Sequence, residues 1–427
     1  MAEMIQAVRG MNDILPPETL LWHHVENTMR RIFQGHGYHE IRFPILEKTE
    51  LFKRSIGEIT DIVEKEMYTF LDRNEESLTL RPEGTASCVR AGIQHGLFYN
   101  QIQRLWYSGP FFRYERPQKG RYRQFHQCSA EVFGLEGPDI DAELIMMSAL
   151  VLEKLGLKSF VKLQINSLGT LESRKAYRQH LVQYFEKNKH QLDEDSLRRL
   201  DKNPLRILDS KNPDMQKLIG GAPKLIDHLD QAAYEHFEKL HEYLSHAGIA
   251  FEVNPFLVRG LDYYSKTVFE WVTDKLGAQG TLCAGGRYDT LVEQLGGKAT
   301  PAIGFSFGME RTVLLLQQAG FNHRAEAALH AYLITDSDES FAAGLKLANY
   351  LRSKVPSLRL QLHCGGGSLK NQFKKADKSG AQYAIIIGEH ERKTRSVSLK
   401  TLREDLPQHT MHQDELAEYL RLNISKK

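Results

Sequence analysis

Two apolar stretches that flank a short basic segment constrain the fold most, because together they predict a long antiparallel hairpin. Residues 105–115 and 124–133 are rich in aromatic residues and in positions where polar and apolar residues alternate, as strands are. Residues 116–123 between them contain Pro117, Gly120 and four cationic side chains, a composition typical of a turn. We therefore expect the rest of the chain to be built around this hairpin.

Polar side chains lie within both predicted strands and not only at their ends. Side chains alternate between the two faces of a strand, so residues two apart share a face. On the first strand, one face would carry Phe111, Arg113 and Glu115. On the second strand, one face would carry Phe125, Gln127, Ser129 and Glu131. An unpaired Arg or Glu is costly to bury, which favours a ligand site over a plain solvent-exposed ribbon. Cations that suit phosphate groups fill the loop: Arg116, Lys119, Arg121 and Arg123.

Length and charge limit the classes of protein to which the chain can belong. A chain of 427 residues exceeds one ordinary core, so two or three domains are expected. Lys and Arg total 56 against 54 Asp and Glu, so a polyanion must be bound by local basic patches. The four cysteines lack metal-binding spacing, and apolar runs of about 18 residues and an apolar signal core are absent. These features predict a cytoplasmic protein with reduced thiols, no metal site of its own and no membrane contact.

Before the hairpin, the sequence predicts a helix and two short strands. Apolar residues recur at helical spacing from Leu21 to Phe33, and residues 40–43 form a strand that stops at Pro44. This layer could belong to the core or to a dimer seam. Residues 78–80 form a strand that leads into RPEGT at 81–85, a glycine-bent turn from which Glu83 and Thr85 could project into a cleft. Thr85 could equally be the N-cap of the helix that follows.

After the hairpin, a helical segment interrupts the strand pattern. A helix at 139–155 and a strand at 160–165 precede residues 169–248, which are charged, helical by periodicity and expected to form an insertion with its own small core. Strands then resume with three glycine-marked runs: RGLDYY (259–264), GTLCAGGRYD (280–289) and PAIGFSFGMER (301–311). The third predicts a strand that turns at Gly308 into a helix carrying Arg311 in its first turn.

From Ala331 onward, strands and helices alternate, which predicts a separate small α/β domain with a mostly parallel sheet. Residues 365–368 (GGGS) lack the spacing of a phosphate-binding loop and indicate a tight strand-to-helix connection. In the helix that follows, Lys370, Lys374 and Lys378 recur every four residues on one face. That face could be simply solvated, or it could contact RNA.

The polar residues permit one kind of chemistry more readily than others. Arg113, Arg259 and Arg311, with the basic loop, could bind a triphosphate without a Walker motif. Acceptors and hydroxyls that suit a small cationic ligand come from Glu83, Gln127, Glu131, Tyr263 and Tyr264. Neither a Ser/His/Asp arrangement nor an HExxH motif stands out. The pattern therefore indicates activation of a small molecule by a nucleotide, not hydrolysis.

These motifs resemble those of a known family. Residues 112–134 resemble the second signature of class II aminoacyl-tRNA synthetases, GFSFGMER at 304–311 the third, and the helix, strand and Pro44 segment the first. RPEGT and RGLDYY look like the histidine-specific signatures of histidyl-tRNA synthetases, closest to the bacterial ones. The resemblance covers nearly the whole chain. It implies an α+β fold in a homodimer, with a six-stranded antiparallel catalytic sheet, a helical insertion and a C-terminal α/β anticodon-binding domain.

The resemblance also implies domain bounds and partners. The catalytic domain would occupy residues 1–168 and 251–326, the insertion 169–250 and the anticodon-binding domain 327–427. The substrates would be L-histidine, ATP with Mg²⁺, and the acceptor end and anticodon of tRNA(His), with histidyl-adenylate as intermediate. By elimination, since a pocket specific for a polar side chain requires no editing domain, residues 169–248 are expected to contact the RNA. A regulatory paralogue without catalysis, or a ligase with a non-RNA acceptor, fits less well, because the catalytic arginines and the terminal module are both present.

Residue roles follow from the same resemblance. Arg113 would hold the α-phosphate opposite Arg259, Phe125 and Arg311 would enclose adenine, and Arg121 would reach the terminal phosphates. Glu83, Thr85 and Gln127 would hold the amino group of histidine, and Glu83 could serve as a base. Glu131 and Tyr264 would bind the imidazole ring beside Tyr263. The acceptor end of the RNA would meet Arg116, Gln118 and Arg123, and its anticodon the stripe of Lys370, Lys374 and Lys378.

Overall fold

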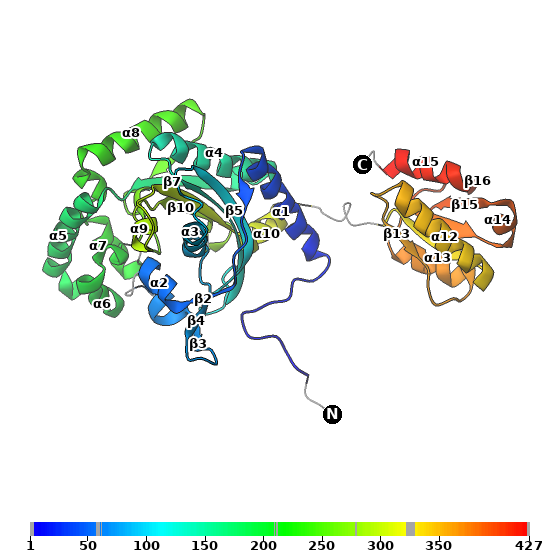
Figure 1. The fold of residues 1–427 in the computed structure, drawn as a ribbon, viewed down its shortest axis with the longest axis horizontal. Coiled ribbons are helices and arrows are strands. Elements are labelled where there is room, and N and C mark those ends of the chain that lie inside the picture. The colour runs from blue at the N-terminus through cyan, green and yellow to red at the C-terminus, as the bar shows by residue number, and fades with distance from the viewer. Residues whose placement is uncertain are drawn as a thin grey trace. The chain divides into compact units, whose positions relative to one another are not determined.

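The computed structural model describes residues 4–56, 60, 62–208, 210, 212–277, 280–321 and 329–424. Two compact units make up the chain, Met1–Phe321 and Asn322–Lys427 (Figure 1). Each has its own sheet, and each is described by itself below. Among the described residues, no helix combines the length and apolarity needed to cross a lipid bilayer.

An eight-stranded sheet forms the centre of the first unit. Its six inner strands are antiparallel, as predicted, and a two-residue strand pairs in parallel with each edge. In spatial order the strands are β1 (His39–Glu40), β5 (Gln103–Phe112), β6 (Gln124–Phe133), β11 (Ala302–Gly308), β10 (Thr281–Arg287), β9 (Ser265–Val272), β7 (Lys162–Ser167) and β8 (Glu252–Val253). The predicted strand at 40–43 was too long: β1 ends at Glu40, and beyond it the Ile41 N–H donates to the Trp106 carbonyl of β5 at 2.9 Å.

Strands β5 and β6 are the predicted hairpin, with Phe111 opposite Phe125 and Gly109 opposite Gln127. One detail of the prediction was wrong: β5 ends at Phe112, so Arg113 begins the loop instead of continuing the strand. Beyond the strand, the Arg113 backbone N–H still donates to the carbonyl of Arg123 at 2.9 Å. Arg113 is therefore anchored to the hairpin without being part of strand β5.

Helices α1 (Glu18–Gly35), α4 (Pro138–Lys154) and α10 (Met309–Gln318) pack against the convex face of the curved sheet (Figure 1). The apolar stripe predicted from Leu21 to Phe33 is buried in the same core cluster as Trp106 and Phe305 of the sheet. Burial of such side chains contributes about 1.5–3 kcal/mol each relative to exposure. This core stabilises the curvature of the sheet, and the concave face lies on the side opposite these helices.

Helix α3 (Thr85–Gln94) lies inside the curve, beside a small sheet of β2 (Leu46–Lys48), β4 (Ser77–Leu80) and β3 (Tyr68–Leu71) (Figure 1). Next to it lie α2 (Thr49–Ile56), a π-helix at Ile62–Glu66 and α9 (Leu291–Gln294). Thr85 is not the N-cap of α3, because that position is Gly84. Instead, the Glu83 carboxylate accepts from the N–H groups of Thr85 at 2.6 Å and Ala86 at 2.9 Å.

The charged segment after β7 is helical, as predicted. It contains α5 (Leu171–Lys187), α6 (Glu194–Lys202), α7 (Gln216–Gly220) and α8 (Gln231–His246), with short 3₁₀ turns between them. Its apolar side chains do not form a separate core: Tyr177 and Leu181 belong to one cluster with Leu257 and Tyr263. The helices therefore pack directly against the part of the chain that carries RGLDYY.

The second unit is the predicted α/β domain. Its sheet has the order β13 (Leu360–Leu362), β12 (Ala331–Thr335), β14 (Tyr383–Ile387), β15 (Ser396–Thr401) and β16 (His409–His412). The first three are parallel, and β15 is antiparallel to both neighbours. The helices are α12 (Asp338–Lys354), α13 (Leu369–Lys378), α14 (Glu389–Thr394) and α15 (Gln413–Ile424). Sequence analysis missed α14 and β16, which are too short for a clear period.

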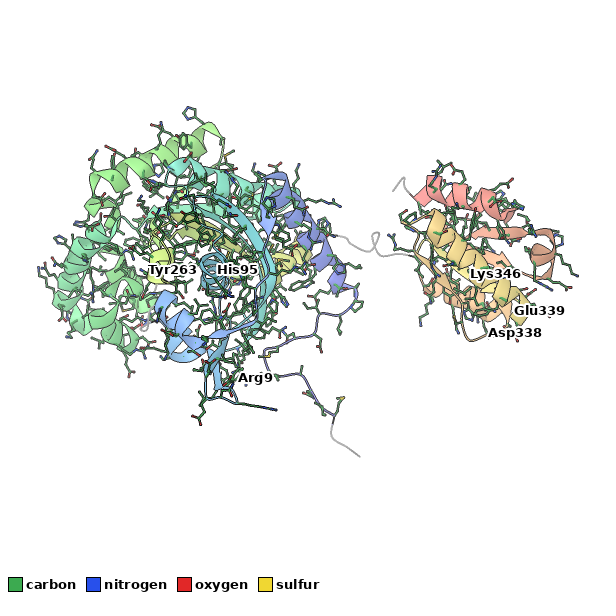
Figure 2. All side chains as sticks on the ribbon, viewed as in Figure 1. Arg9, His95, Tyr263, Asp338, Glu339 and Lys346 are labelled. Atoms are coloured by element: carbon green, nitrogen blue, oxygen red, sulfur yellow. The ribbon has the colours of Figure 1, made fainter. Side chains whose placement is uncertain are left out.

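Local signals explain the helix starts of this unit. Ser337 caps α12, and Asp338 and Glu339 (Figure 2) occupy its first turn. Negative charge there interacts favourably with the helix dipole and stabilises the helix. Gly365, Gly366 and Gly367 all have positive φ, and Ser368 then caps α13. The predicted tight connection is thus confirmed, since the glycines turn the chain from strand to helix.

Candidate active site

A cavity of about 300 Å³ opens in the first unit, on the sheet face opposite α1, α4 and α10. Residues from several widely separated stretches line it, so only the folded chain brings them together. Most of the site residues predicted from the sequence are among them: Glu83, Thr85, Arg113, Arg121, Phe125, Gln127, Arg259, Tyr263, Tyr264 and Arg311. The three predicted phosphate-binding arginines therefore share one cavity.

The Arg113 side chain is fixed from two sides. Its Nε donates to the carbonyl of Pro82 at 2.9 Å, and its guanidinium lies 5.2 Å from the ring centroid of Phe125. Burial lowers the pKa of Arg113, although Glu66 and Glu83 partly oppose the effect. Arginine keeps its charge despite such a shift, so a fully cationic group faces the cavity.

Arg259 forms an ion pair with Glu270, whose second carboxylate oxygen accepts from the Thr281 hydroxyl at 3.0 Å. Its guanidinium also lies 5.6 Å from the ring centroid of Tyr264. Burial is the largest single influence and would lower the pKa of Arg259, but Glu270 together with Tyr264 and Tyr263 outweighs it, so the pKa is raised. Glu270 therefore stabilises the charged form of Arg259 and fixes the orientation of its guanidinium.

The other two cations of the cavity are tied to the hairpin loop. Arg121 pairs with Glu115 and lies 3.8 Å from a carboxylate oxygen of Glu66. Arg311 donates to the backbone carbonyl of Gly120 at 2.9 Å and of Thr281 at 2.8 Å. The loop is thus closed over the cavity by the same side chains that line it.

Glu131 is almost fully buried, at 2% exposure, directly behind the wall of the cavity. Its carboxylate accepts from the hydroxyls of Thr85 at 2.9 Å, Tyr107 at 2.8 Å and Tyr288 at 2.5 Å. Room for it exists because Gly304 lies opposite: a Cβ there would come 1.6 Å from the Glu131 Oε2. Burial raises the pKa of Glu131 to about 7, although the three hydroxyls counteract it.

This raised pKa predicts a pH dependence of stability. The native state holds the Glu131 proton up to pH about 7, whereas an unfolded Glu loses it near its ordinary pKa of 4.5. The contribution is therefore complete below pH 4.5 and is lost as the pH rises to about 7. We expect the free energy of unfolding of the wild type to fall across this window by about 2–3 kcal/mol relative to Glu131→Gln. Urea titrations of both proteins at several pH values measure it; parallel curves would contradict it.

The remaining predicted residues lie elsewhere. Arg116 and Gln118 are exposed on the hairpin loop, and Arg123 packs over the Tyr114 ring at 3.8 Å. None of the three lines the cavity. In the second unit, Lys370, Lys374 and Lys378 are all exposed on α13, opposite the buried Gln372 and Ala376. Their RNA contacts remain a prediction.

Sequence analysis missed several acids of the site. Glu270 and Glu310 line the cavity, and Glu310 accepts from the backbone N–H of His126 at 2.9 Å. A signal for Glu270 was present, since it interrupts the apolar run TVFEWV just as Glu131 interrupts its strand. Tyr288 carried no such signal, because a tyrosine after a strand is ordinary.

Comparisons with known proteins agree with this geometry. Residues 10–312 match the family model "Histidyl-tRNA synthetase", and residues 330–423 match "Anticodon binding domain". The crystal structure of apo histidyl-tRNA synthetase from S. aureus is 36% identical, with a TM-score of 0.82, over 98% of this chain and 100% of that one.

Two more distant structures share the fold. Histidyl-tRNA synthetase from Nostoc sp. PCC 7120 is 20% identical, with a TM-score of 0.70, over 99% of this chain and 100% of that one. A Bacillus halodurans protein, described as an ATP phosphoribosyltransferase regulatory subunit/histidyl-tRNA synthetase, is 22% identical, with a TM-score of 0.64, over 91% of this chain and 99% of that one. Because the family model spans most of the chain and both units are matched, the chain belongs to the histidyl-tRNA synthetases, the class II enzymes that ligate histidine to tRNA.

Proposed function

We propose that the cavity activates L-histidine with ATP and then transfers it to tRNA(His). In the first step, the histidine carboxylate attacks the α-phosphorus of ATP in line, and pyrophosphate leaves as histidyl-adenylate forms. In the second step, the 3′-terminal ribose hydroxyl attacks the acyl carbon of the adenylate, and AMP leaves. The observation that carries the proposal is the convergence of Arg113, Arg259 and Arg311 on one cavity beside Glu83.

The arginines suit the charge that develops during adenylation. Arg113 and Arg259 would hold the α-phosphate, because preorganised cations stabilise charge that grows at that centre. Phe125 and Arg311 would enclose the adenine, and Arg121 would exchange its carboxylate partners for the terminal phosphates. Both reacting groups would then be held in line, which supplies much of the rate.

Magnesium would enter with the nucleotide as part of the substrate. In the described part of the chain, no group of three or more His, Cys, Asp or Glu side chains is placed to hold a metal ion. Mg²⁺ commonly binds one or two carboxylates together with substrate phosphates, so the ion would be carried mainly by ATP. Glu270 and Glu115 are carboxylates of the cavity wall that could contribute.

The amino-acid pocket would lie beside the arginines. Glu83, Thr85 and Gln127 would bind the α-amino group, and Tyr263 would line the pocket. Tyr264 would contact the imidazole ring, with Glu131 as the buried carboxyl behind it. Either Glu83 or an adenylate oxygen would take the proton of the ribose hydroxyl. A pocket that hydrogen-bonds a polar side chain rejects ligands that lack it, because its own buried groups would stay unpaired.

The remaining parts of the proposal concern the RNA and the assembly. Arg116, Gln118 and Arg123 would meet the acceptor end of tRNA(His), and the lysine face of α13 would meet the anticodon. Its cations lie on one exposed helix face, which suits a phosphate backbone. The family resemblance further implies a homodimer that acts in the cytoplasm.

The first step can be measured without RNA. We expect histidine to drive the exchange of labelled pyrophosphate into ATP, and amino acids without an imidazole to drive it at least about 10⁴-fold less efficiently. Each of the other amino acids, assayed singly, serves as a matched control. Exchange driven equally by several of them, or no exchange with histidine, would end the proposal.

A further inference from the structure

Residues 259–264, which carry Arg259 and Tyr264, belong to no helix or strand. Backbone carbonyls in such a loop have no sheet partner and must be paired with side chains or water when they are buried. Two of these carbonyls, those of Asp262 and Tyr264, are paired with a side chain of the helical segment after β7. The loop is therefore shaped from outside the sheet.

That side chain is Arg174 on α5. Its Nη1 donates to the carbonyl of Asp262 at 3.2 Å, and its Nη2 donates to the carbonyl of Tyr264. The planar guanidinium holds its two N–H groups at a fixed angle, so the two carbonyls it binds are fixed relative to each other. Along the chain, these carbonyls enclose the backbone of Tyr263 and Tyr264. The direction of both tyrosine side chains depends on the peptide planes that Arg174 holds.

The same helical segment holds the loop at a second place. The Asp262 side chain accepts from Asn203 Nδ2 at 2.9 Å, and Arg206 lies 3.7 Å from the same carboxylate oxygen. Asn203 precedes the 3₁₀ helix Pro204–Ile207, to which Arg206 belongs, far from Arg174 in the sequence. Two separate parts of the segment thus converge on one loop residue and its neighbours.

The contacts with this loop account for the position of the Arg174 side chain. Burial lowers its pKa, and Asp262 only partly opposes that effect. Burying a guanidinium is costly unless its N–H groups find partners. Its described hydrogen bonds both go to the loop. Helix α5 therefore carries a half-buried cation whose contacts serve the substrate loop.

We propose that Arg174 is a positioning residue for histidine binding, through which the helical segment fixes the loop that carries Arg259 and Tyr264. This inference rests on the proposed function, because that function makes the loop part of the histidine pocket. Arg174 touches no substrate itself. It sets where Tyr263 and Tyr264 stand, so its loss enlarges and loosens the pocket without removing any ligand-binding group.

Steady-state pyrophosphate exchange tests the inference, because a Michaelis constant does not depend on the fraction of active protein. For Arg174→Ala we expect KM for histidine to rise about 10-fold or more, and KM for ATP to change by less than about 3-fold. Arg174→Lys should recover part of the affinity, since an ammonium can still donate to one carbonyl. Lys175→Ala, at an exposed cation next to it on α5, is the matched control.

Two results would overturn the inference: a KM for histidine within about twofold of the wild type in Arg174→Ala, or equal rises in both constants. If Arg174→Ala does not fold, Arg174→Lys decides by the same comparison, since a merely structural arginine would leave KM unchanged in the folded fraction. Failure of the proposed function looks different. There the wild type itself shows no exchange with histidine, and the positioning role falls with it.

Discussion

Replacing Arg259 with histidine slows histidine-dependent pyrophosphate exchange by about 10²-fold or more. Arg259 is the cation that Glu270 holds at the cavity, and the proposed reaction needs it where negative charge develops on the α-phosphate. The change also leaves Glu270 without its charged partner, which adds repulsion against the nucleotide. The loss should fall on kcat, because the interaction is strongest in the transition state. Initial rates of exchange at saturating substrates measure it.

A matched control separates charge loss at the site from charge loss in general. Arg73 lies exposed in the turn between β3 and β4, away from the cavity. Arg73→Ala should exchange at the wild-type rate. Near-normal exchange in Arg259→His would remove Arg259 from the role assigned to it, and an equal loss in both variants would point to a general effect of charge.

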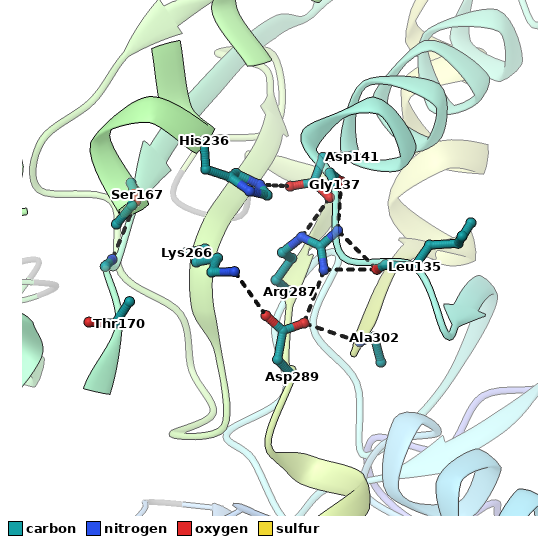
Figure 3. A network of polar contacts seen from close by, with 12 residues as sticks. Leu135, Gly137, Asp141, Ser167, Thr170, His236, Lys266, Arg287, Asp289 and Ala302 are labelled. Carbon is teal, nitrogen blue, oxygen red and sulfur yellow. Dashed lines mark hydrogen bonds and ion pairs between the residues drawn. The ribbon is translucent and has the colours of Figure 1, made fainter. Parts of the chain in front are cut away.

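Replacing Arg287 with alanine lowers the free energy of unfolding of the first unit by about 3–5 kcal/mol. Arg287 and Asp141 are both fully buried and form an ion pair at 2.8 Å (Figure 3). The guanidinium also donates to the carbonyls of Leu135 at 3.1 Å and Gly137 at 2.7 Å. Among the described residues, the contact that Asp141 keeps after the change is with His236 Nε2 at 2.8 Å. A buried carboxylate then remains with too few partners, and that is what destabilises the fold.

Urea unfolding of the whole chain, followed by intrinsic fluorescence, measures this loss. The control is Lys189→Ala, which breaks the exposed pair between Lys189 and Glu186 and should cost less than about 1 kcal/mol. A loss in Arg287→Ala no larger than that of the control would mean that the network contributes little.

Local signals in the sequence predicted most of the fold. The hairpin followed from two apolar runs around Pro117 and Gly120, and the first helix from the apolar spacing between Leu21 and Phe33. The turn at Gly308 likewise placed Arg311 at the start of α10. In each case the cause lies within a few residues of the effect, which is why the sequence carries it.

Other features depend on contacts between distant parts of the chain, which no single stretch reveals. Glu131 was predicted to face the ligand, yet it is enclosed by hydroxyls that come from three other stretches, those of Thr85, Tyr107 and Tyr288. Arg174 lies in a charged helix, where one more cation gives no signal. The folded structure is needed to show that α5 packs Arg174 against the loop.

The carboxylates around Arg121 have a consequence for selectivity among anions. Without a nucleotide, Glu115 and Glu66 neutralise the charge of Arg121. The cavity is therefore not expected to bind small anions unselectively. A lone phosphate or sulfate gains little by displacing two carboxylates to reach one arginine. In the proposed function, a chain of linked phosphates held at the same time by Arg113 and Arg259 would bring its terminal group to Arg121 at high local concentration. Under that proposal, the two carboxylates beside Arg121 would make binding depend on the length of the polyphosphate.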